Sequence, residues 1–529
     1  MNAKDIISAG KAVLGIEFGS TRIKAVLIDD TYAPIAQGAH DWENRLENGI
    51  WTYSLSDITL GLQDCYRSLA EDVREKYGIT LTKLAGIGFS AMMHGYMAFD
   101  KNGELLVPFR TWRNSITGDA AKELTALFNY NIPQRWSIAH LYQAMLNKEE
   151  HLSNLDFFTT LDGFIHWKLT GNKVLGIGEA SGMFPIDIET KNYDADMIAK
   201  FDALSKSHGY DIKLGDILPK VLLAGDSAGA LTKEGALFID PTGTLEAGIP
   251  LCPPEGDAGT GMVATNSVRE RTGNISAGTS IFAMVVLEKA LKNVYPEIDL
   301  VTTPTGSLVA MVHCNNCTSE INAWVNMLKE FSTAAGFDIP TSKFYEIMFN
   351  EALSGDTDCG GLLLYNYLSG ENVTGLDEGR PLFVRRPDSK FNFKNFARVN
   401  IYSALASLKV GLDILNENED IKIDKMFAHG GLYKTPVVGQ KLSAAAINAP
   451  VSVMSTAGEG GAWGMALLCA YMLDKEADEN LEDFLLNKVF KGDEGTLIEP
   501  DKDEVAGFNE FIKTYKKGLE IEKSAVLNM

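Results

Sequence analysis

An aspartate surrounded by glycines is the residue with the clearest chemical potential in this chain. Asp257 stands in the segment PEGDAGTGMVA, with Gly256, Gly259 and Gly261 around it. Transfer of a phosphoryl group to an alcohol needs a carboxylate that accepts the hydroxyl proton, and a backbone without bulk lets the donor phosphate approach. Asp257 is therefore a candidate general base. The alternative is an aspartate that only bonds the backbone of its own turn.

Two short polar turns, half a chain apart, could bind phosphate. Gly19-Ser20-Thr21 lies between VLGIEF and IKAVLID, and Gly278-Thr279-Ser280 lies between GNISA and IFAMVVL. Each pattern predicts a strand, a tight turn and a second strand. The backbone N–H groups and hydroxyls of such a turn suit a phosphate. The presence of this strand–turn–strand motif once in each half suggests a duplicated scaffold that binds one polyphosphate. The alternative is two ordinary hairpins.

Three further segments are candidates for binding. Met93-His94-Gly95 follows an expected strand and could line a sugar pocket, or His94 could be an ordinary buried histidine. The Gly430-Gly431 turn could receive an adenine or a ribose, or it could only join a strand to a helix. The HCNNC segment at 313–317 lacks a fourth zinc ligand at a suitable distance, so we expect a strand-end turn there. The sequence has neither a Walker motif nor a kinase-type H-R-D run.

Hydrophobic spacing predicts the elements that position these residues. Two hairpins are expected at 13–29 and 272–287, and shorter strands at 83–92 and 427–431. Asp257 is expected on a turn, and a helix is expected to end at Gly171. Further helices are expected at 57–77, 120–130, 139–152, 318–332, 341–353, 396–416, 434–447 and 459–473.

Bulk properties exclude several classes of protein. A chain of 529 residues is too long for one core, so two large domains are expected, 1–268 and 269–529, with the boundary placed by the repeated hairpin. The formal net charge of −22 argues against nucleic acid and anionic membranes as partners. Six scattered cysteines and no signal pattern indicate a reducing, cytoplasmic location.

Taken in order, these segments resemble the FGGY carbohydrate kinases over about residues 12–475. The quoted strings are VLGIEFGSTRIKAVLID, SAMMHGYMAFDKNGELLVPFRTWRN, LDGFIHWKLTG, GEASGMFPID, GDAGTGMVATNSVRERTGNISAGTS, and FAHGGLYKTPVVGQKLSAAAINAPV with GEGGAWGMALL. The resemblance implies an α/β fold with two ribonuclease-H-like (actin-like ATPase) domains and an interdomain cleft. It assigns sugar and phosphate binding to the N-terminal domain and nucleotide binding to the C-terminal domain.

The resemblance also implies a role for each matching residue. Asp257 matches the general base, which also contacts the sugar, and Met93 and His94 match the substrate-side pair of xylulokinase-like members, whereas glycerol kinases have Arg-Glu there. The donor phosphates and the nucleotide would be bound by the matching turn residues Gly19, Ser20, Thr21, Lys24, Gly278, Thr279, Gly430 and Gly431.

Three departures from the family pattern bear on function. Glu17 replaces the usual aspartate near the nucleotide-bound Mg²⁺, so it would reach the metal directly or through water. The W-x-D pattern of the sugar segment is Trp112-Arg113-Asn114 here, and both Trp112 and Asn114 are expected at the substrate. The family's G-E-R-x-P loop is altered at 370–374.

The expected activity is ATP- and Mg²⁺-dependent phosphorylation of a small sugar. A ketopentose, L-ribulose or D-xylulose, is the leading substrate class, and gluconate or a polyol is the alternative within the same fold. The resemblance also allows a homodimer. Two other classes stay open: an actin-like or Hsp70-like ATPase switch, and a regulatory sugar binder without catalysis.

Overall fold

The computed structural model describes residues 2–454, 460–492 and 495–529, which form two compact units. The first unit contains residues 1–268, 299–309 and 459–491, and the second contains 269–298, 310–458 and 492–529. The chain thus leaves the first unit after Val268, where the sequence boundary was placed, but it returns twice. The compact units thus differ from the predicted domains 1–268 and 269–529 in residues 299–309 and 459–491. The segment 459–491 belongs to the first unit because α15 (Gly460–Asp474) is apolar on all sides and packs on the sheet of that unit.

The first unit is built on a five-stranded sheet of order β13-β6-β1-β2-β3. The strands β1, β2 and β3 form an antiparallel meander, and β6 and β13 extend the sheet in parallel with β1. The bounds are β1 Val13–Phe18, β2 Arg22–Ile28, β3 Pro34–Asp41, β6 Gly86–Ala91 and β13 Glu255–Gly256. The hairpin at 13–29 and the strand within 83–92 were expected from sequence.

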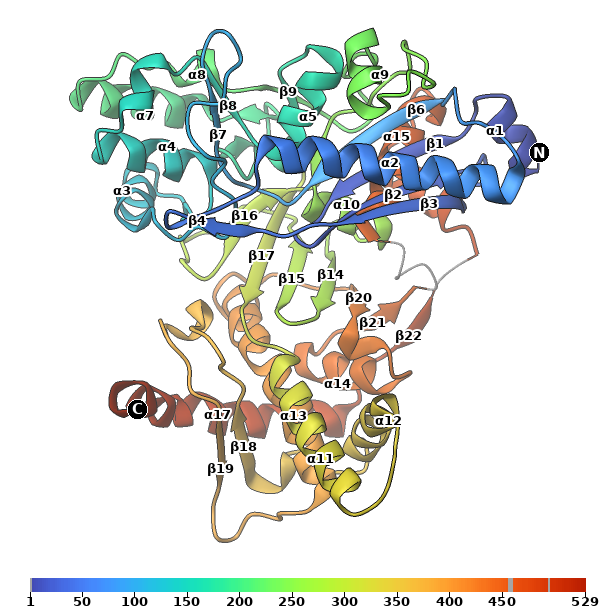
Figure 1. Ribbon diagram of the computed structural model, residues 1–529. Helices are drawn as coiled ribbons and strands as arrows, with labels where there is room; N and C mark the ends of the chain where they lie inside the picture. Colours follow the sequence, from blue (N-terminus) through green and yellow to red (C-terminus); the bar gives the residue numbers. More distant parts are fainter. Residues whose placement is uncertain (1, 455–459, 493–494) are drawn as a thin grey trace. The chain divides into compact units, whose positions relative to one another are not determined.

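Two helices cover the opposite faces of this sheet. A Cβ on Gly15 would lie 2.1 Å from the carbonyl of Ala462 on α15, and one on Gly38 would lie 2.4 Å from the carbonyl of Cys65 on α2 (Leu55–Tyr77). Gly15 pairs with Val26, whereas Gly38 pairs with Ala25, so the two glycines point to opposite faces. Figure 1 shows α2 running along the meander. Glycine is required at both positions because each helix approaches the strand backbone closely.

The remaining elements of the first unit surround this sheet. The helices are α1 Ala3–Ser8, α3 Gly118–Phe128, α4 Ser137–Leu146, α5 Leu161–Thr170, α6 Ile177–Ala180, α7 Ala195–Ser207, α8 Leu214–Ile217, α9 Lys233–Ile239, α10 Asp257–Ala264 and α16 Leu481–Phe484. The short strands are β4 Arg45–Glu47, β5 Ile50–Thr52, β7 Met97–Phe99, β8 Phe157–Thr159, β9 Val174–Gly176, β10 Ile186–Asp187, β11 Asn192–Tyr193, β12 Lys220–Leu222 and β16 Asp299–Thr302.

Two expectations for this unit need correction. The helix expected at 139–152 ends at Leu146, and a separate 3₁₀ turn follows at Glu150–Asn154. Asp257 is the first residue of helix α10 rather than part of an irregular turn. The helix packs closely on α15: a Cβ on Gly464 of α15 would lie 2.0 Å from the carbonyl of Thr260. Tertiary packing therefore overrides the low helix propensity of the segment.

The second unit repeats the strand plan of the first. Its strands belong to a seven-stranded sheet of order β16-β17-β15-β14-β20-β21-β22, in which β14 and β15 form the second hairpin and β20 and β21 extend it in parallel. The bounds are β14 Thr272–Ala277, β15 Ile281–Val286, β17 Leu308–Cys314, β18 Leu362–Tyr365, β19 Leu382–Arg385, β20 Lys425–Gly430, β21 Val451–Val453 and β22 Thr496–Ile498. The helices are α11 Ser319–Ala334, α12 Thr341–Ala352, α13 Phe393–Asp413, α14 Val438–Ile447 and α17 Lys502–Asn528. The repeated hairpin is thus the start of a repeated sheet.

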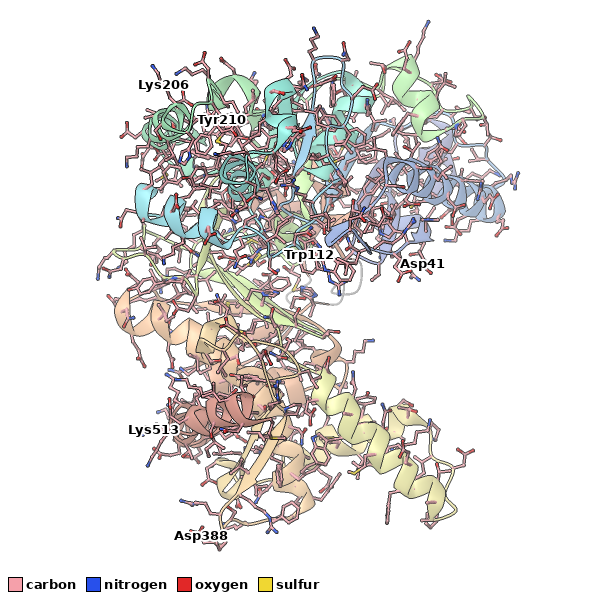
Figure 2. All side chains as sticks on the ribbon, turned by 60° about the vertical axis from the view of Figure 1, so that its left-hand side comes forward. Asp41, Trp112, Lys206, Tyr210, Asp388 and Lys513 are labelled. Carbon is pink, nitrogen blue, oxygen red and sulfur yellow. The ribbon has the colours of Figure 1, made fainter. Side chains whose placement is uncertain are left out.

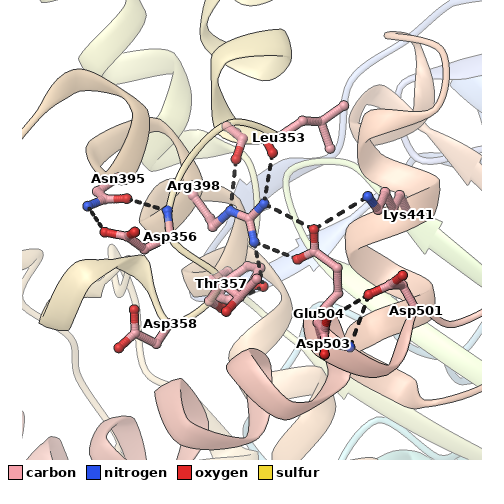
Figure 3. A network of polar contacts seen from close by, with 12 residues as sticks. Leu353, Asp356, Thr357, Asp358, Asn395, Arg398, Lys441, Asp501, Asp503 and Glu504 are labelled. Atoms are coloured by element: carbon pink, nitrogen blue, oxygen red, sulfur yellow. Dashed lines mark hydrogen bonds and ion pairs between the residues drawn. The ribbon is translucent and has the colours of Figure 1, made fainter.

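A buried ion pair attaches the C-terminal helix α17 to the second unit (Figure 3). Arg398 on α13 is fully buried and pairs with Glu504 on α17 through two N–H···O bonds. Its other N–H groups donate to the carbonyls of Ala352 and Leu353. Because every polar group of the pair has a partner, the cost of burying these charges is offset.

Candidate active site

The phosphate-binding, sugar-side and base residues predicted in the first unit follow three parallel strands. The turn Gly19-Ser20-Thr21 follows β1, Met93-His94 follows β6, and Asp257 follows β13. Because β13, β6 and β1 are adjacent and parallel, their carboxyl ends meet at one edge of the sheet. Ligands of open α/β sheets bind at this edge. The fold therefore brings together residues separated by more than two hundred positions in sequence.

Asp257 is held by backbone N–H groups at the start of α10. Its Oδ1 accepts the amide of Met93 at 3.2 Å, and the amides of Asp257 itself and Ala258 also bond the carboxylate. Burial nevertheless raises the pKa of Asp257 above its ordinary value, and these hydrogen bonds oppose the rise. The result is an oriented carboxylate with increased proton affinity, as a general base requires.

Met93 and His94 form a tight turn behind Asp257. His94 adopts a left-handed conformation (φ 73°), and its side chain is 4% exposed. Its Nδ1 lies 3.1 Å from the carbonyl of Gly182, so Nδ1 carries the proton and the ring stacks on Trp136. Both Met93 and His94 are mostly buried, so only a small part of each side chain can face a ligand.

Glu17 lies on β1, the strand next to β6, and its side chain is on the sheet face that α15 covers. Its carboxylate accepts the amides of Gly461 and Ala462 at the first turn of α15, and Lys24 is its cross-strand partner. Burial and the neighbouring charge of Asp257 raise the pKa of Glu17 from 4.5 to about 7, although the α15 amides and Lys24 oppose the rise. A Cβ on Gly461 would lie 2.5 Å from Oε2 of Glu17, so glycine is needed there. The longer side chain of Glu17 thus reaches the helix N-terminus.

In the first polar turn, all three carbonyl groups are bonded to the protein. Trp42 donates its indole N–H to Gly19 (2.7 Å) and its backbone amide to Thr21 (3.1 Å), and the Tyr53 hydroxyl donates to Ser20 (2.6 Å). The rings of Trp42 and Tyr53 stack 4.0 Å apart. Ser20 and Thr21 remain exposed. The carbonyl oxygens, which are the negative ends of the peptide dipoles, therefore point into the protein. This orientation favours an anion on the solvent-exposed side of the turn.

The second polar turn, in the other unit, shows the same arrangement. The carbonyl of Gly278 accepts the amide and hydroxyl of Thr318, and the carbonyl of Thr279 accepts the amide of Cys317. Thr279 itself is exposed. Gly430 pairs with Ala277 across β14 and β20, so its turn lies at the same edge of this sheet. Its φ of 105° and a Cβ position 2.3 Å from the Ala277 carbonyl explain why glycine is required there.

The structure gives Asn114 contacts that its predicted role did not anticipate. Its Oδ1 accepts the Trp51 amide at 2.9 Å, and its Nδ2 donates to the carbonyls of Trp51 (2.8 Å) and Thr111 (3.0 Å). An aspartate could not donate to those carbonyls, which gives a physical reason for asparagine in the W-x-D pattern. Trp112 (Figure 2), two residues earlier, is 38% exposed. Asn114 thus fixes the loop that carries Trp112.

The HCNNC segment is a strand-end turn, as expected. The strand β17 ends at Cys314, and Glu371 from the altered 370–374 loop accepts the next two amides. Cys314 and Cys317 are buried with raised thiol pKa values. Within the described ranges, no cluster of three or more His, Cys, Asp or Glu side chains could hold a metal ion. All six cysteines are buried and free.

Three buried carboxyl groups near Asp257 were missed by sequence reasoning. Asp162 and Glu179 are 0% exposed and Glu255 is 1% exposed. Burial raises the pKa of Asp162 to about 7, that of Glu255 to about 8 and that of Glu179 well above its ordinary value. Each acid adjoins a glycine in sequence (D-G, G-E and E-G). An acidic residue next to a glycine near a strand end could have indicated these buried groups in the sequence, because a buried carboxyl group needs backbone amides close to it.

Comparison with known proteins identifies the family. The model of the FGGY family of carbohydrate kinases, N-terminal domain, matches residues 12–263, and that of the C-terminal domain matches residues 273–473. This chain belongs to the FGGY family of carbohydrate kinases. It is 21% identical over 474 residues to a xylulose kinase of Haemophilus influenzae, which covers 84% of this chain and 91% of that protein.

Solved structures of FGGY kinases share the fold of this chain. A ligand-bound xylulose kinase from Lactobacillus acidophilus matches with a TM-score of 0.79 and 17% identity, over 98% of this chain and 99% of that chain. A gluconate kinase from Lactobacillus acidophilus matches with a TM-score of 0.77 and 18% identity, over 96% of this chain and 97% of that chain. The expected α/β fold with two domains of the actin-like ATPase type is confirmed.

Membership in the family establishes the general activity. The chain is a carbohydrate kinase, so its substrates are a small sugar and ATP. No helix among the described residues is long and apolar enough to span a membrane. The roles of individual residues, including Gly430 and Gly431, remain predictions, and 455–459 of the segment before α15 lie outside the described residues.

Proposed function

We propose that this FGGY kinase transfers the γ-phosphoryl group of ATP to a terminal hydroxyl of a ketopentose, with L-ribulose and D-xylulose as leading substrates. The observation that carries the proposal is Asp257 at the carboxyl end of β13, beside the Met93-His94 turn that follows β6. The expected reaction forms a bond between the sugar oxygen and the γ-phosphorus and breaks the bond to the β-phosphate oxygen. Asp257 accepts the hydroxyl proton, and ADP leaves.

The charge around Asp257 favours a neutral sugar over gluconate. Besides burial, the pKa of Glu179 is shifted by the carboxyl groups of Asp162, Asp257 and Glu255 and by the His94 amide, whereas that of Asp257 is shifted by backbone amides. A gluconate carboxylate brought to this acidic cluster would be repelled by any ionised neighbour. A ketopentose carries no charge, and its hydroxyls can donate to carboxylates.

The first polar turn and Glu17 suit a magnesium nucleotide, and the second polar turn offers phosphate-binding groups of the same kind within the other unit. Exposed Ser20, Thr21 and Thr279 offer amides and hydroxyls to phosphate oxygens, and Lys24 adds positive charge next to the first turn. Mg²⁺ usually takes one or two carboxylates, water and substrate phosphates, so Glu17 with Asp257 nearby is a sufficient protein contribution. The ion would neutralise charge on the transferring group. Glu17 would bind the ion's water shell while its α15 contacts keep the side chain in place.

A coupled ADP-release screen over ketopentoses, aldonates and polyols tests the proposal. We expect turnover with a ketopentose and little with gluconate. Asp257→Asn keeps the shape of the side chain and should reduce kcat by about 10²–10⁴-fold while ATP still binds. Asp100→Asn, in a surface turn, is the matched control. Near-normal turnover of Asp257→Asn would refute the assignment of the base, and ADP release independent of any sugar would favour the ATPase switch.

A further inference from the structure

The Glu179 carboxyl group is buried directly behind the proposed catalytic base. Glu179 lies on the short helix α6 and is 0% exposed. Its Oε1 accepts the amide of His94 at 3.1 Å. Its Oε2 is buried without a hydrogen-bond partner among the described residues. A fully buried carboxyl with one engaged oxygen is costly, which suggests a role beyond packing.

A second carboxyl group holds Glu179 in place. Glu255 accepts the amides of Gly178 (3.3 Å) and Glu179 (3.0 Å) at the start of α6. A Cβ on Gly178 would lie 2.3 Å from Oε2 of Glu255, and one on Gly256 would lie 2.3 Å from Oε2 of Glu179. The backbone of α6 and of the β13–α10 junction is therefore shaped around these two carboxyl groups.

Successive amides of one turn bind Glu179 and Asp257. The Met93 amide donates to Asp257 at 3.2 Å, and the next amide, that of His94, donates to Glu179. The turn is strained at His94, a non-glycine residue with a φ of 73°, whereas Gly95 adopts its φ of 98° without that cost. A strained turn keeps its shape only when its surroundings hold it, and the bond to Glu179 supplies such a constraint.

We propose that Glu179 is a positioning residue for the phosphoryl transfer: it anchors the His94 amide and thereby fixes the adjacent Met93 amide that orients Asp257. This inference rests on the proposed function of Asp257 as the base. Glu179 does not touch the reacting atoms. It acts through the backbone of Met93-His94.

The anchor depends on the position of an oxygen atom rather than on a negative charge. Burial and repulsion by Asp162 and Asp257 raise the pKa of Glu179 well above its ordinary value, which favours the protonated form over the carboxylate. Oε1 can accept the His94 amide whether the group is charged or neutral. Asp257 remains the carboxylate that can accept a proton.

Two substitutions separate position from charge. Glu179→Gln keeps an acceptor oxygen at the same reach, so we expect kcat within about threefold of the parent enzyme. Glu179→Asp keeps a carboxyl group but is one methylene shorter, so it loses the His94 bond. We expect its kcat to fall by about 10–100-fold with little change in the KM for ATP. The variant that keeps the acid should thus be less active than the variant that removes it.

The pH profile supplies a readout that a merely structural role would not change. The Met93 bond lowers the pKa of Asp257, so its loss should move the acidic limb of kcat/KM to higher pH in Glu179→Asp. Glu179→Gln should keep the parent profile. Glu179→Ala removes the anchor without crowding and should repeat the shift, which keeps the test decisive if Glu179→Asp does not fold.

Several results would overturn the inference. These are equal activity of the parent, Gln and Asp forms, a Gln form as impaired as the Asp form, or reduced kcat without movement of the acidic limb. If Asp257→Asn is inactive but Glu179→Gln is no more active than Glu179→Asp, only the positioning role of Glu179 is wrong. If Asp257→Asn is active, the proposed function is wrong.

Discussion

Replacing Glu17 by glutamine should stabilise the protein, and increasingly so as the pH rises. The carboxyl group has a pKa of about 7 in the folded chain against an ordinary 4.5, chiefly because it is buried. Between these values the folded state holds a proton that the unfolded state has released, so stability falls as pH rises through this window. The penalty is absent below about pH 4.5 and complete above about pH 7.

The magnitude follows from the same shift. Each pKa unit corresponds to about 1.4 kcal/mol, so a rise from 4.5 to about 7 costs at most about 3 kcal/mol. Glu17 keeps some contact with solvent, and glutamine bonds the α15 amides more weakly, so we expect a net gain of about 2 kcal/mol at pH 8. For a unit of this size that is a rise in melting midpoint of roughly 4 °C.

Thermal unfolding at pH 6, 7 and 8, followed by tryptophan fluorescence, measures this effect. Six of the seven tryptophans lie in the first unit, and only Trp324 lies in the second, so the signal reports mainly on the unit that contains Glu17. Glu47→Gln, on an exposed strand, is the control. A Glu17→Gln protein that is less stable at pH 8, or whose gain is the same at all three pH values, would refute the reasoning. Loss of activity in the stabilised variant would show that the buried carboxylate is kept for function at the expense of stability.

Two further predictions concern the first polar turn and the C-terminal helix. Tyr53→Phe removes the hydroxyl that binds the Ser20 carbonyl, so the KM for ATP should rise about fivefold while the KM for the sugar stays unchanged. The control is Tyr66→Phe, which removes a hydroxyl that bonds the carbonyl of Leu81. Equal KM values for ATP in both variants would contradict the role of this turn. Glu504→Gln leaves the buried Arg398 without a counter-charge, so the free energy of unfolding of the second unit, measured by urea denaturation, should fall by about 3 kcal/mol. The double variant Arg398→Met/Glu504→Leu should recover most of this loss of stability. A Glu504→Gln protein as stable as the parent would show that the pair contributes little.

Local patterns in the sequence were sufficient for the parts of the fold that depend on neighbours in the chain. Alternating apolar residues around Gly19-Ser20-Thr21 and Gly278-Thr279-Ser280 predicted both hairpins, because strand and turn preferences act over a few residues. The order of the motifs predicted the family, which the comparisons confirm. The helix over 139–152 was predicted too long, since propensity alone sets helix ends poorly.

Only the tertiary structure decided how distant segments meet. Helix α15 returns to the first unit, and its first-turn amides bind Glu17, a contact between residues more than four hundred positions apart. Asn114 bonds the backbone of Trp51, and Glu179 bonds that of His94, so their tasks depend on chain segments that no local pattern identifies. The sequence by itself determined the hairpins, the family and the candidate base. Long-range packing decided which carboxyl groups are buried together, because the cost of burying charge is set by what the fold brings around it.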